Sequence, residues 1–178
     1  GVLIASARTA VPTRVARSSC ANRIPTSTTS NPVVSVDANG ADEGTGAVAE
    51  GVRRCGLPVL LFGPAAELRE PGPHAEIVDA PETIRGGEEP AAAVRARRDA
   101  SIVQAAAAVG DGRADALVSA GSTGPTLAAG TIAIRRIRGV FRPALAVLLP
   151  LPHGDVLLLD AGASVEVRPE HLVQFAYM

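Results

Sequence analysis

The chain has 178 residues, enough for one domain with a sizeable core, and a formal net charge of −1. Hydrophobic residues make up 47% of it but aromatic residues only 2%, so the core must consist of Val, Leu, Ile and Ala. The sequence contains no lysine, which excludes Schiff-base chemistry and a P-loop lysine within this chain. No run approaches the ~20 apolar residues of a membrane-spanning helix.

Residues 1–32 differ in composition from the remainder. They hold four arginines, many Ser and Thr residues and no acid, which resembles a transit peptide, but we favour a disordered tail or sequence upstream of the true start. Acidic residues outnumber arginines in the rest, so we expect no nucleic-acid partner. Cys20 and Cys55 match no metal or redox spacing, so we expect no metal, no cofactor and a reduced, cytoplasmic setting.

The predicted elements alternate between strands and helices. Apolar runs predict strands, in chain order, at 33–36, 59–62, 76–78, 116–118, 145–149 and 156–160. Helical patterns and start signals predict helices at 45–55, from 88 to a break near 99, from there to 109, from 123 to about 136, and from 169 onward. The short link 150–154 predicts an antiparallel hairpin, whereas the other connections predict parallel pairing. We therefore expect an α/β fold, a three-layer α/β/α sandwich with a mixed, mostly parallel sheet over 33–178.

Polar residues end three of the predicted strands. Asp37, Ser119 and Asp160 each precede a turn that contains glycine, and a helix then follows. Ligands of open α/β sheets bind outside the carboxyl ends of the strands, so the sequence predicts a site where these turns meet. The alternative is that each Asp is an ordinary turn former.

The turn at 119–124 has the composition of an anion site. Its glycines allow a ligand to approach the backbone closely, and its hydroxyls lie beside the free N–H groups at the start of a helix. We expect Thr123 to cap this helix and Pro125 to lie in its first turn. The alternative is a simple capped strand-to-helix turn. The residues concerned are Ser119, Gly121, Ser122, Thr123 and Gly124.

Two other chemistries fit poorly. No G-x-G-x-x-G follows a predicted strand, so a dinucleotide fingerprint is absent. The turn that carries Ser164 lacks the second glycine of a nucleophile elbow, which argues against a serine hydrolase. An anion site with carboxylates nearby is what remains.

Five motifs in order resemble those of the bacterial phosphate acyltransferase family of phospholipid synthesis. They read Asp-Ala-Asn-Gly-Ala-Asp at 37–42, Ser-Ala-Gly-Ser-Thr-Gly at 119–124, Arg-Pro-Ala-Leu-Ala at 142–146, Leu-Leu-Asp-Ala-Gly-Ala at 158–163 and Arg-Pro-Glu-His-Leu-Val-Gln-Phe-Ala at 168–176. The resemblance implies conversion of acyl-[acyl carrier protein] and inorganic phosphate to acyl phosphate and free carrier protein. It also implies a homodimer, a fold similar to isopropylmalate dehydrogenases and phosphotransacetylases, and delivery of the product to the membrane glycerol-phosphate acyltransferase from the cytoplasm or the membrane periphery.

The resemblance also implies roles for individual residues. The turn at 119–124, with Asn39 and Gly40, would hold phosphate, while Arg168 would supply positive charge and His171 would protonate the departing thiolate. The remaining predicted residues are Asp160 at the reacting centre and Asp37, Asp42, Ser164 and Glu166 as lining. The alternative for His171 is a packed first-turn helix residue. The chain departs from the family at Asn39 and Ala41, where Met and Gly are usual, and at 164–168, where Asn, Asp, Cys and Lys are replaced by Ser164, Glu166, Val167 and Arg168.

Four arginines near the end of the helix after the phosphate turn predict a docking patch for the acidic carrier protein. They are Arg135, Arg136, Arg138 and Arg142. Complementing the helix dipole would explain one or two of them.

Because the last predicted helix runs to Met178 without a cap, we expect this chain to be the first half of a larger protein. The alternatives are a phosphotransacetylase-like enzyme acting on acyl-CoA, and an inactive fragment that only binds a partner.

Overall fold

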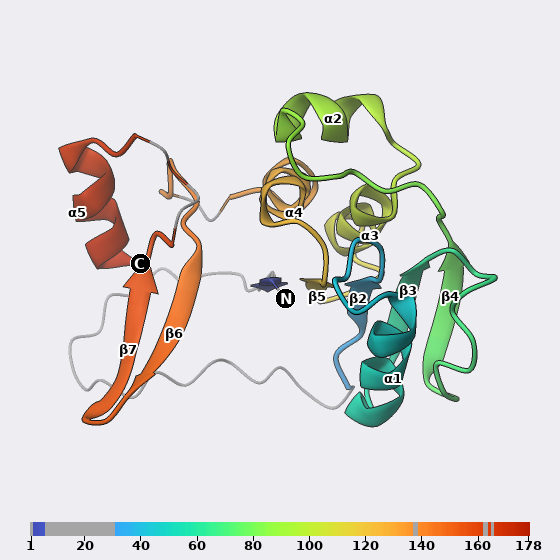
Figure 1. Ribbon diagram of the computed structural model, residues 1–178. Helices are drawn as coiled ribbons and strands as arrows, with labels where there is room; N and C mark the ends of the chain where they lie inside the picture. Colours follow the sequence, from blue (N-terminus) through green and yellow to red (C-terminus); the bar gives the residue numbers. More distant parts are fainter. Residues whose placement is uncertain (1, 6–30, 137–138, 162–163, 165) are drawn as a thin grey trace.

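The computed structural model describes residues 2–5, 31–136, 139–161, 164 and 166–178. A five-stranded sheet carries helices on its faces, and a separate hairpin with one helix follows it (Figure 1). The elements in chain order are β1 (Val2–Ala5), β2 (Val34–Asp37), α1 (Thr45–Cys55), β3 (Val59–Gly63), β4 (Ala75–Asp79), α2 (Pro90–Ala96), α3 (Ser101–Gly110), β5 (Ala116–Ser119), α4 (Thr123–Ala129), a π-helical turn (Gly130–Ile134), β6 (Ala146–Leu151), β7 (Gly154–Leu159) and α5 (Pro169–Tyr177).

The main sheet has the strand order β1-β5-β2-β3-β4. Strands β5, β2, β3 and β4 are parallel, and β1 pairs antiparallel with β5. Mostly parallel pairing with flanking helices confirms the predicted α/β class. Strand β1 lies inside the segment predicted to be a tail, where no strand was expected. The parallel register places Asp37 beside Ser119, so the carboxyl ends of β2 and β5 coincide.

Two separate apolar clusters cover the two faces of this sheet. Leu61 belongs to the cluster formed with α1, and the next residue, Phe62, belongs to the cluster formed with α2, α3 and α4. Successive side chains of a strand point to opposite faces, so both faces of β3 are buried. Half of the buried residues of α3 are alanines, whose small side chains let the helix approach the sheet closely. This is the helix–sheet–helix layering that the sequence predicts.

The predicted break between the two middle helices is confirmed, but its cap is not. Helix α2 ends at Ala96 and α3 begins at Ser101. The N-cap of α3 is Ala100, without a side-chain cap, whereas Asp99 or Ser101 was expected. The backbone N–H of Ser101 instead donates to the carbonyl oxygen of Glu82 at 2.9 Å, so a tertiary hydrogen bond satisfies this N–H in place of a side-chain cap.

Helix α4 also begins differently from the prediction. Its N-cap is Ser122, so Thr123 is the first helical residue and Pro125 the third. The regular helix ends at Ala129 and continues as the π-helical turn up to Ile134. Arg135, with φ of +72°, then ends the element. A change of helical hydrogen-bonding pattern leaves little trace in the sequence, which explains the difference.

The hairpin of β6 and β7 is antiparallel, as predicted, but it forms a sheet of its own. The main sheet is mixed because of β1 and not because of the hairpin, whose strands do not belong to it. Asp160, which follows β7, therefore does not lie at the edge that Asp37 and Ser119 share. The hairpin and α5 stand together to one side of the main sheet in Figure 1. Leu157 and Leu158 point to opposite faces of β7 and are both exposed.

The described residues hold neither a membrane-spanning helix nor a cluster of metal-binding side chains. None of their helices is long and apolar enough to span a bilayer. The same residues contain no group of three or more His, Cys, Asp or Glu side chains placed to hold a metal ion.

Candidate functional site

A buried carboxylate lies at the shared edge of β2 and β5. Asp37 is only 2% exposed. Its Oδ1 accepts a hydrogen bond from the Ser101 hydroxyl at 2.6 Å, and its Oδ2 accepts one from the Ser119 hydroxyl at 2.8 Å. The backbone N–H of Asn39 also donates to Oδ1, at 3.3 Å. The structure thus unites two predicted strand-end residues through direct contact, and adds Ser101 from the start of α3.

Asn39 joins this carboxylate to the neighbouring loop. Its side-chain amide donates to the carbonyl oxygens of Ala80 and Glu82, at 2.9 Å and 3.3 Å, and to the Ser101 hydroxyl at 3.0 Å. Asn39 therefore acts as a clamp between the turn after β2, the segment after β4 and the start of α3. Sequence reasoning missed Ser101, because nothing in a local pattern tells that a helix N-terminus contacts a strand end 64 residues away.

Burial raises the pKa of the Asp37 carboxyl above its ordinary value of 3.8. The hydrogen bonds from Ser101, Ser119 and the Asn39 backbone lower this pKa and so partly oppose the rise. Removal from water destabilises the charged form, whereas donors stabilise it. The carboxyl is therefore a structural centre whose protonation is coupled to folding.

The turns after β2 and β5 touch each other at two glycines. A Cβ built on Gly40 would lie 3.3 Å from the Cα of Gly121, and one built on Gly121 would lie 2.8 Å from the carbonyl oxygen of Asn39. The N–H of Gly121 donates to the Ser119 hydroxyl at 3.1 Å. Gly40 also has φ of +76°, which L side chains rarely adopt. Both glycines are thus required by the approach of one turn to the other.

The hollow between these turns is small. Its volume is about 10 Å³, which is room for roughly one water molecule. Phosphate is too large for this hollow, so the predicted anion site, which stays a prediction, would be on the outer side of the turn, near Ser122 and the exposed Thr123. The N–H groups of Thr123 and Gly124 in the first turn of α4 have no intrahelical acceptor and are available there.

Two predicted residues of this edge have other surroundings than expected. A Cβ built on Gly124 would lie 3.0 Å from Cγ of Pro90, so this glycine is required by the packing of α4 on α2. Asp42 is exposed in the turn before α1 and does not join the hydrogen bonds described around Asp37. Their roles in phosphate binding and site lining stay predictions.

The other predicted site residues gather around the hairpin and α5. The Arg142 guanidinium donates from Nε to the Ser164 hydroxyl at 2.7 Å, and the backbone N–H of Leu145 donates to Asp160 at 3.2 Å. Glu166 is exposed. Arg142, Ser164 and Asp160 belong to the hairpin region, whereas the hydrogen bonds of Asp37 join the ends of β2 and β5 to the start of α3, so the predicted site forms two clusters.

Arg168 and His171 are close together at the start of α5. The backbone N–H of Arg168, the N-cap residue, donates to Nδ1 of His171 at 3.2 Å. This bond needs a lone pair on Nδ1, so the ring proton resides on Nε2. His171 thus lies in the first turn of α5, and its Nε2–H is able to donate. Whether it acts in catalysis or is only a packed first-turn residue stays a prediction.

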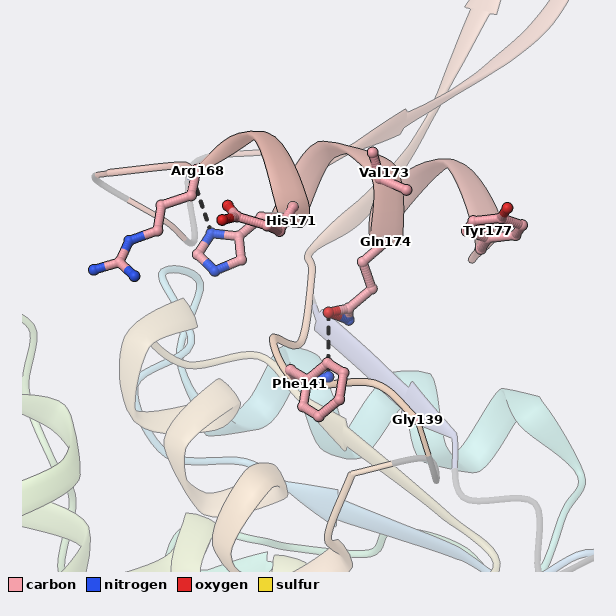
Figure 2. A pocket seen from close by; sticks show the side chains of 8 residues that line it. Gly139, Phe141, Arg168, His171, Val173, Gln174 and Tyr177 are labelled. Carbon is pink, nitrogen blue, oxygen red and sulfur yellow. Dashed lines mark hydrogen bonds between the residues drawn. The ribbon is translucent and has the colours of Figure 1, made fainter.

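A groove of about 570 Å³ runs along α5 (Figure 2). One side is the helix itself, and the other is the loop that precedes the hairpin. Its lining consists of Gly139, Phe141, Arg168, Glu170, His171, Val173, Gln174 and Tyr177. Two of the three residues predicted to be catalytic, Arg168 and His171, thus line this groove.

The predicted docking arginines do not share one environment. Arg135 is exposed, and Arg136 donates to the carbonyl oxygen of Phe141, which borders the groove. Arg142 is half-buried against Ser164. Arg138 lies outside the described residues. A basic surface beside the groove therefore rests on Arg135 and Arg136.

A family model described as fatty acid synthesis protein matches residues 32–178. The phosphate acyltransferase of Desulfitobacterium hafniense (strain Y51) is 42% identical over 155 residues, which cover 82% of this chain and 46% of the relative. The phosphate acyltransferases of Bacillus licheniformis and Salinibacter ruber are 44% and 42% identical, with 82% of this chain and 47% of each relative covered. The chain spans about half the length of these curated relatives.

Proposed function

The chain belongs to the fatty acid synthesis protein family, and from this premise we propose that the whole protein is a phosphate acyltransferase. It transfers the acyl group of acyl-[acyl carrier protein] to inorganic phosphate, which gives acyl phosphate for phosphatidic acid synthesis and free carrier protein. The observation that carries this proposal is the family match over residues 32–178, with relatives named phosphate acyltransferase at 42–44% identity.

The chemistry needs positioning more than a special nucleophile. Phosphate is nucleophilic at neutral pH, so the site must hold it against the thioester carbon and stabilise the oxyanion that forms. In our proposal the outer side of the turn after β5 binds phosphate through Ser122, Thr123 and the free N–H groups of α4. The thioester carbonyl is bound at the start of α5, and for attack it must come within about 3–3.5 Å of this phosphate, so in our proposal the two clusters approach each other in the whole protein.

His171 and Arg168 would act on the thioester from the groove. With Nδ1 engaged by the Arg168 backbone, the neutral imidazole offers Nε2–H to the carbonyl oxygen or the departing sulfur. Protonating the thiolate would first require a proton on Nδ1 and loss of this bond, so a donated hydrogen bond is the simpler role. The Arg168 guanidinium would balance the negative charge of the tetrahedral intermediate.

The deciding experiment measures thiol release with the reading frame continued past Met178 to the length of the relatives. Release from acyl-[acyl carrier protein] that depends on phosphate, and is much faster than from acyl-CoA, supports the proposal. Faster release from acyl-CoA favours a phosphotransacetylase-like enzyme. No phosphate-dependent release from either substrate favours a protein that only binds a partner, and contradicts the proposed activity.

We expect Ser122→Ala combined with Thr123→Ala to raise the KM for phosphate in that longer chain by about tenfold. A hydrogen bond to an anion is worth roughly 1.5–3 kcal/mol, and the partial exposure of this turn reduces that value. Neither side chain caps α4, so the melting temperature should stay unchanged. The measurement is initial rate against phosphate concentration. An unchanged KM for phosphate would contradict the assignment of this turn.

The basic surface beside the groove gives a second prediction. Arg135→Glu should raise the KM for acyl-[acyl carrier protein] severalfold at low salt, because an acidic carrier would be steered less well. Arg113→Glu, a change of another exposed arginine between α3 and β5, is the control and should have little effect. Equal effects of both changes, or an equal loss with a short acyl-pantetheine, would contradict docking at this surface.

Further parts of the proposal concern assembly and place. We propose a homodimer that works in the cytoplasm or at the membrane periphery, where the membrane glycerol-phosphate acyltransferase takes up the acyl phosphate. Sedimentation of the longer chain tests the dimer.

A further inference from the structure

We propose that the groove along α5 binds the fatty acyl chain of the thioester, with the carbonyl end at Arg168 and His171 and the tail toward Tyr177. This inference rests on the proposed function, since it assumes an acyl thioester as substrate. The groove holds about 570 Å³, within the range of roughly 300–1,000 Å³ that is usual for small-molecule sites.

Along α5, the groove is lined by Arg168, Glu170 and His171 at the helix start and by Val173 and Tyr177 nearer the helix end. Phe141, Val173 and Tyr177 line it and are 79%, 58% and 89% exposed. An exposed patch of large apolar side chains is typical of ligand grooves and interaction sites. Arg168 and His171 stand at the opposite end of the same helix (Figure 2). The lining therefore matches a ligand with a polar head and an aliphatic tail.

The two walls of the groove are fixed to each other. The side-chain oxygen of Gln174 accepts hydrogen bonds from the backbone N–H groups of Phe141 and Arg142, at 3.2 Å and 3.3 Å. Its amide group faces the Arg142 carbonyl oxygen at 3.5 Å. The loop that carries Phe141 is thus held against α5 without a ligand, so binding costs little ordering of this wall.

The charges favour a thioester over a free fatty acid. Glu170 and Arg168 both line the groove and carry opposite charges. A free carboxylate would gain from the arginine but be repelled by the glutamate, whereas the neutral carbonyl of a thioester needs only a donor. His171 supplies that donor at Nε2. We therefore take the acyl thioester, and not a fatty acid, as the occupant.

The sequence supplies a reporter for the test. The chain contains one tyrosine and no tryptophan, so its fluorescence comes from Tyr177 in the groove. We would titrate the 178-residue chain with non-hydrolysable thioether analogues of acyl-pantetheine and follow this fluorescence. Affinity should rise by up to about fourfold for each methylene that the groove buries, and stop rising once the groove is full.

Neighbouring residues of α5 provide matched variants. Val173 lines the groove and Leu172 does not, although they are similarly exposed at 58% and 61%. Val173→Asp should weaken binding of the longest analogue by about tenfold, the value of one buried valine. Leu172→Asp should leave it unchanged, and so should Leu157→Asp on the exposed hairpin, which controls for nonspecific adsorption.

Several results would overturn the proposal. They are equal losses with Val173→Asp and Leu172→Asp, a loss with Leu157→Asp, no dependence on acyl length, and no fluorescence change. Val173→Asp that shifts the sedimentation of the unliganded chain would show that a second copy covers the groove. Loss of binding in the longer chain would show that its own polypeptide fills it.

Activity separates failure of this inference from failure of the proposed function. If the analogues bind as predicted but the longer chain shows no phosphate-dependent thiol release, the assignment of the groove is supported and the proposed activity is contradicted. If release occurs and Val173→Asp leaves the KM for the acyl substrate unchanged, the function stands and the groove assignment is wrong.

Discussion

Replacing Asp37 by alanine is expected to lower the free energy of unfolding by about 2–4 kcal/mol, because it leaves buried hydroxyl donors without an acceptor. The Ser101 and Ser119 hydroxyls both donate to this carboxylate, at 2.6 Å and 2.8 Å. Typical domains have roughly 5–15 kcal/mol in total, so the loss would be a large fraction of it. The measurement is chemical unfolding followed by circular dichroism. A change below about 0.5 kcal/mol, as at an ordinary surface site, would contradict the network.

Asp37→Asn is the matched variant, and it tests the pH dependence. The pKa of Asp37 is raised in the folded state from 3.8, so the folded chain binds this proton more tightly than the unfolded chain. Its contribution to stability is therefore fully present below pH 3.8 and is lost as pH rises through the raised folded pKa. The stability of the unchanged protein should fall relative to Asp37→Asn over that window and stay level above it. Parallel pH profiles would show that Asp37 titrates alike in both states.

Local patterns predicted most elements of the main sheet and its helices. The helix at Thr45–Cys55 was predicted with the bounds that the structure shows. Its apolar face and Gly56, which takes the left-handed conformation, mark its extent in the sequence itself. The end of α4 was predicted less well, because the passage from α to π hydrogen bonding follows from packing. A Cβ on Gly110 would lie 2.6 Å from the carbonyl oxygen of Ala133, a contact between α3 and the π-helical turn that no local pattern reveals.

The site was predicted in part for the same reason. Parallel strands bring their carboxyl ends together, so the contact of Asp37 with Ser119 followed from the topology. Asp160 was assigned to that edge because its strand looked like the others, yet β7 pairs only with β6 among the described strands. The resemblance to phosphate acyltransferases rested on the order of motifs and not on the strand pairing, and the family match confirms it.

The contact of the two turns leads to the sharpest steric prediction. Gly121→Ala should destabilise the fold by about 1–3 kcal/mol, the usual cost of overpacking. The added Cβ would lie 2.8 Å from the backbone oxygen of Asn39, and backbone cannot move aside as a flexible side chain can. Since φ of Gly121 lies outside the left-handed region, the cost is steric and not conformational. The Asn39 clamp would have to shift, so hydrogen exchange at the start of α3 should speed up with the loss of stability.

Gly51→Ala is expected to change the stability of the same chain in the opposite direction. Gly51 lies inside α1 with nothing within 4 Å of a built Cβ, so alanine should stabilise the protein by about 0.5–1 kcal/mol through lower chain entropy and better helix propensity. The two variants make the same chemical change and differ only in what the methyl group meets. If Gly121→Ala also stabilised the chain, the turns after β2 and β5 could not be in contact, and the arrangement of Asp37, Asn39 and Ser119 at this edge would have to be abandoned.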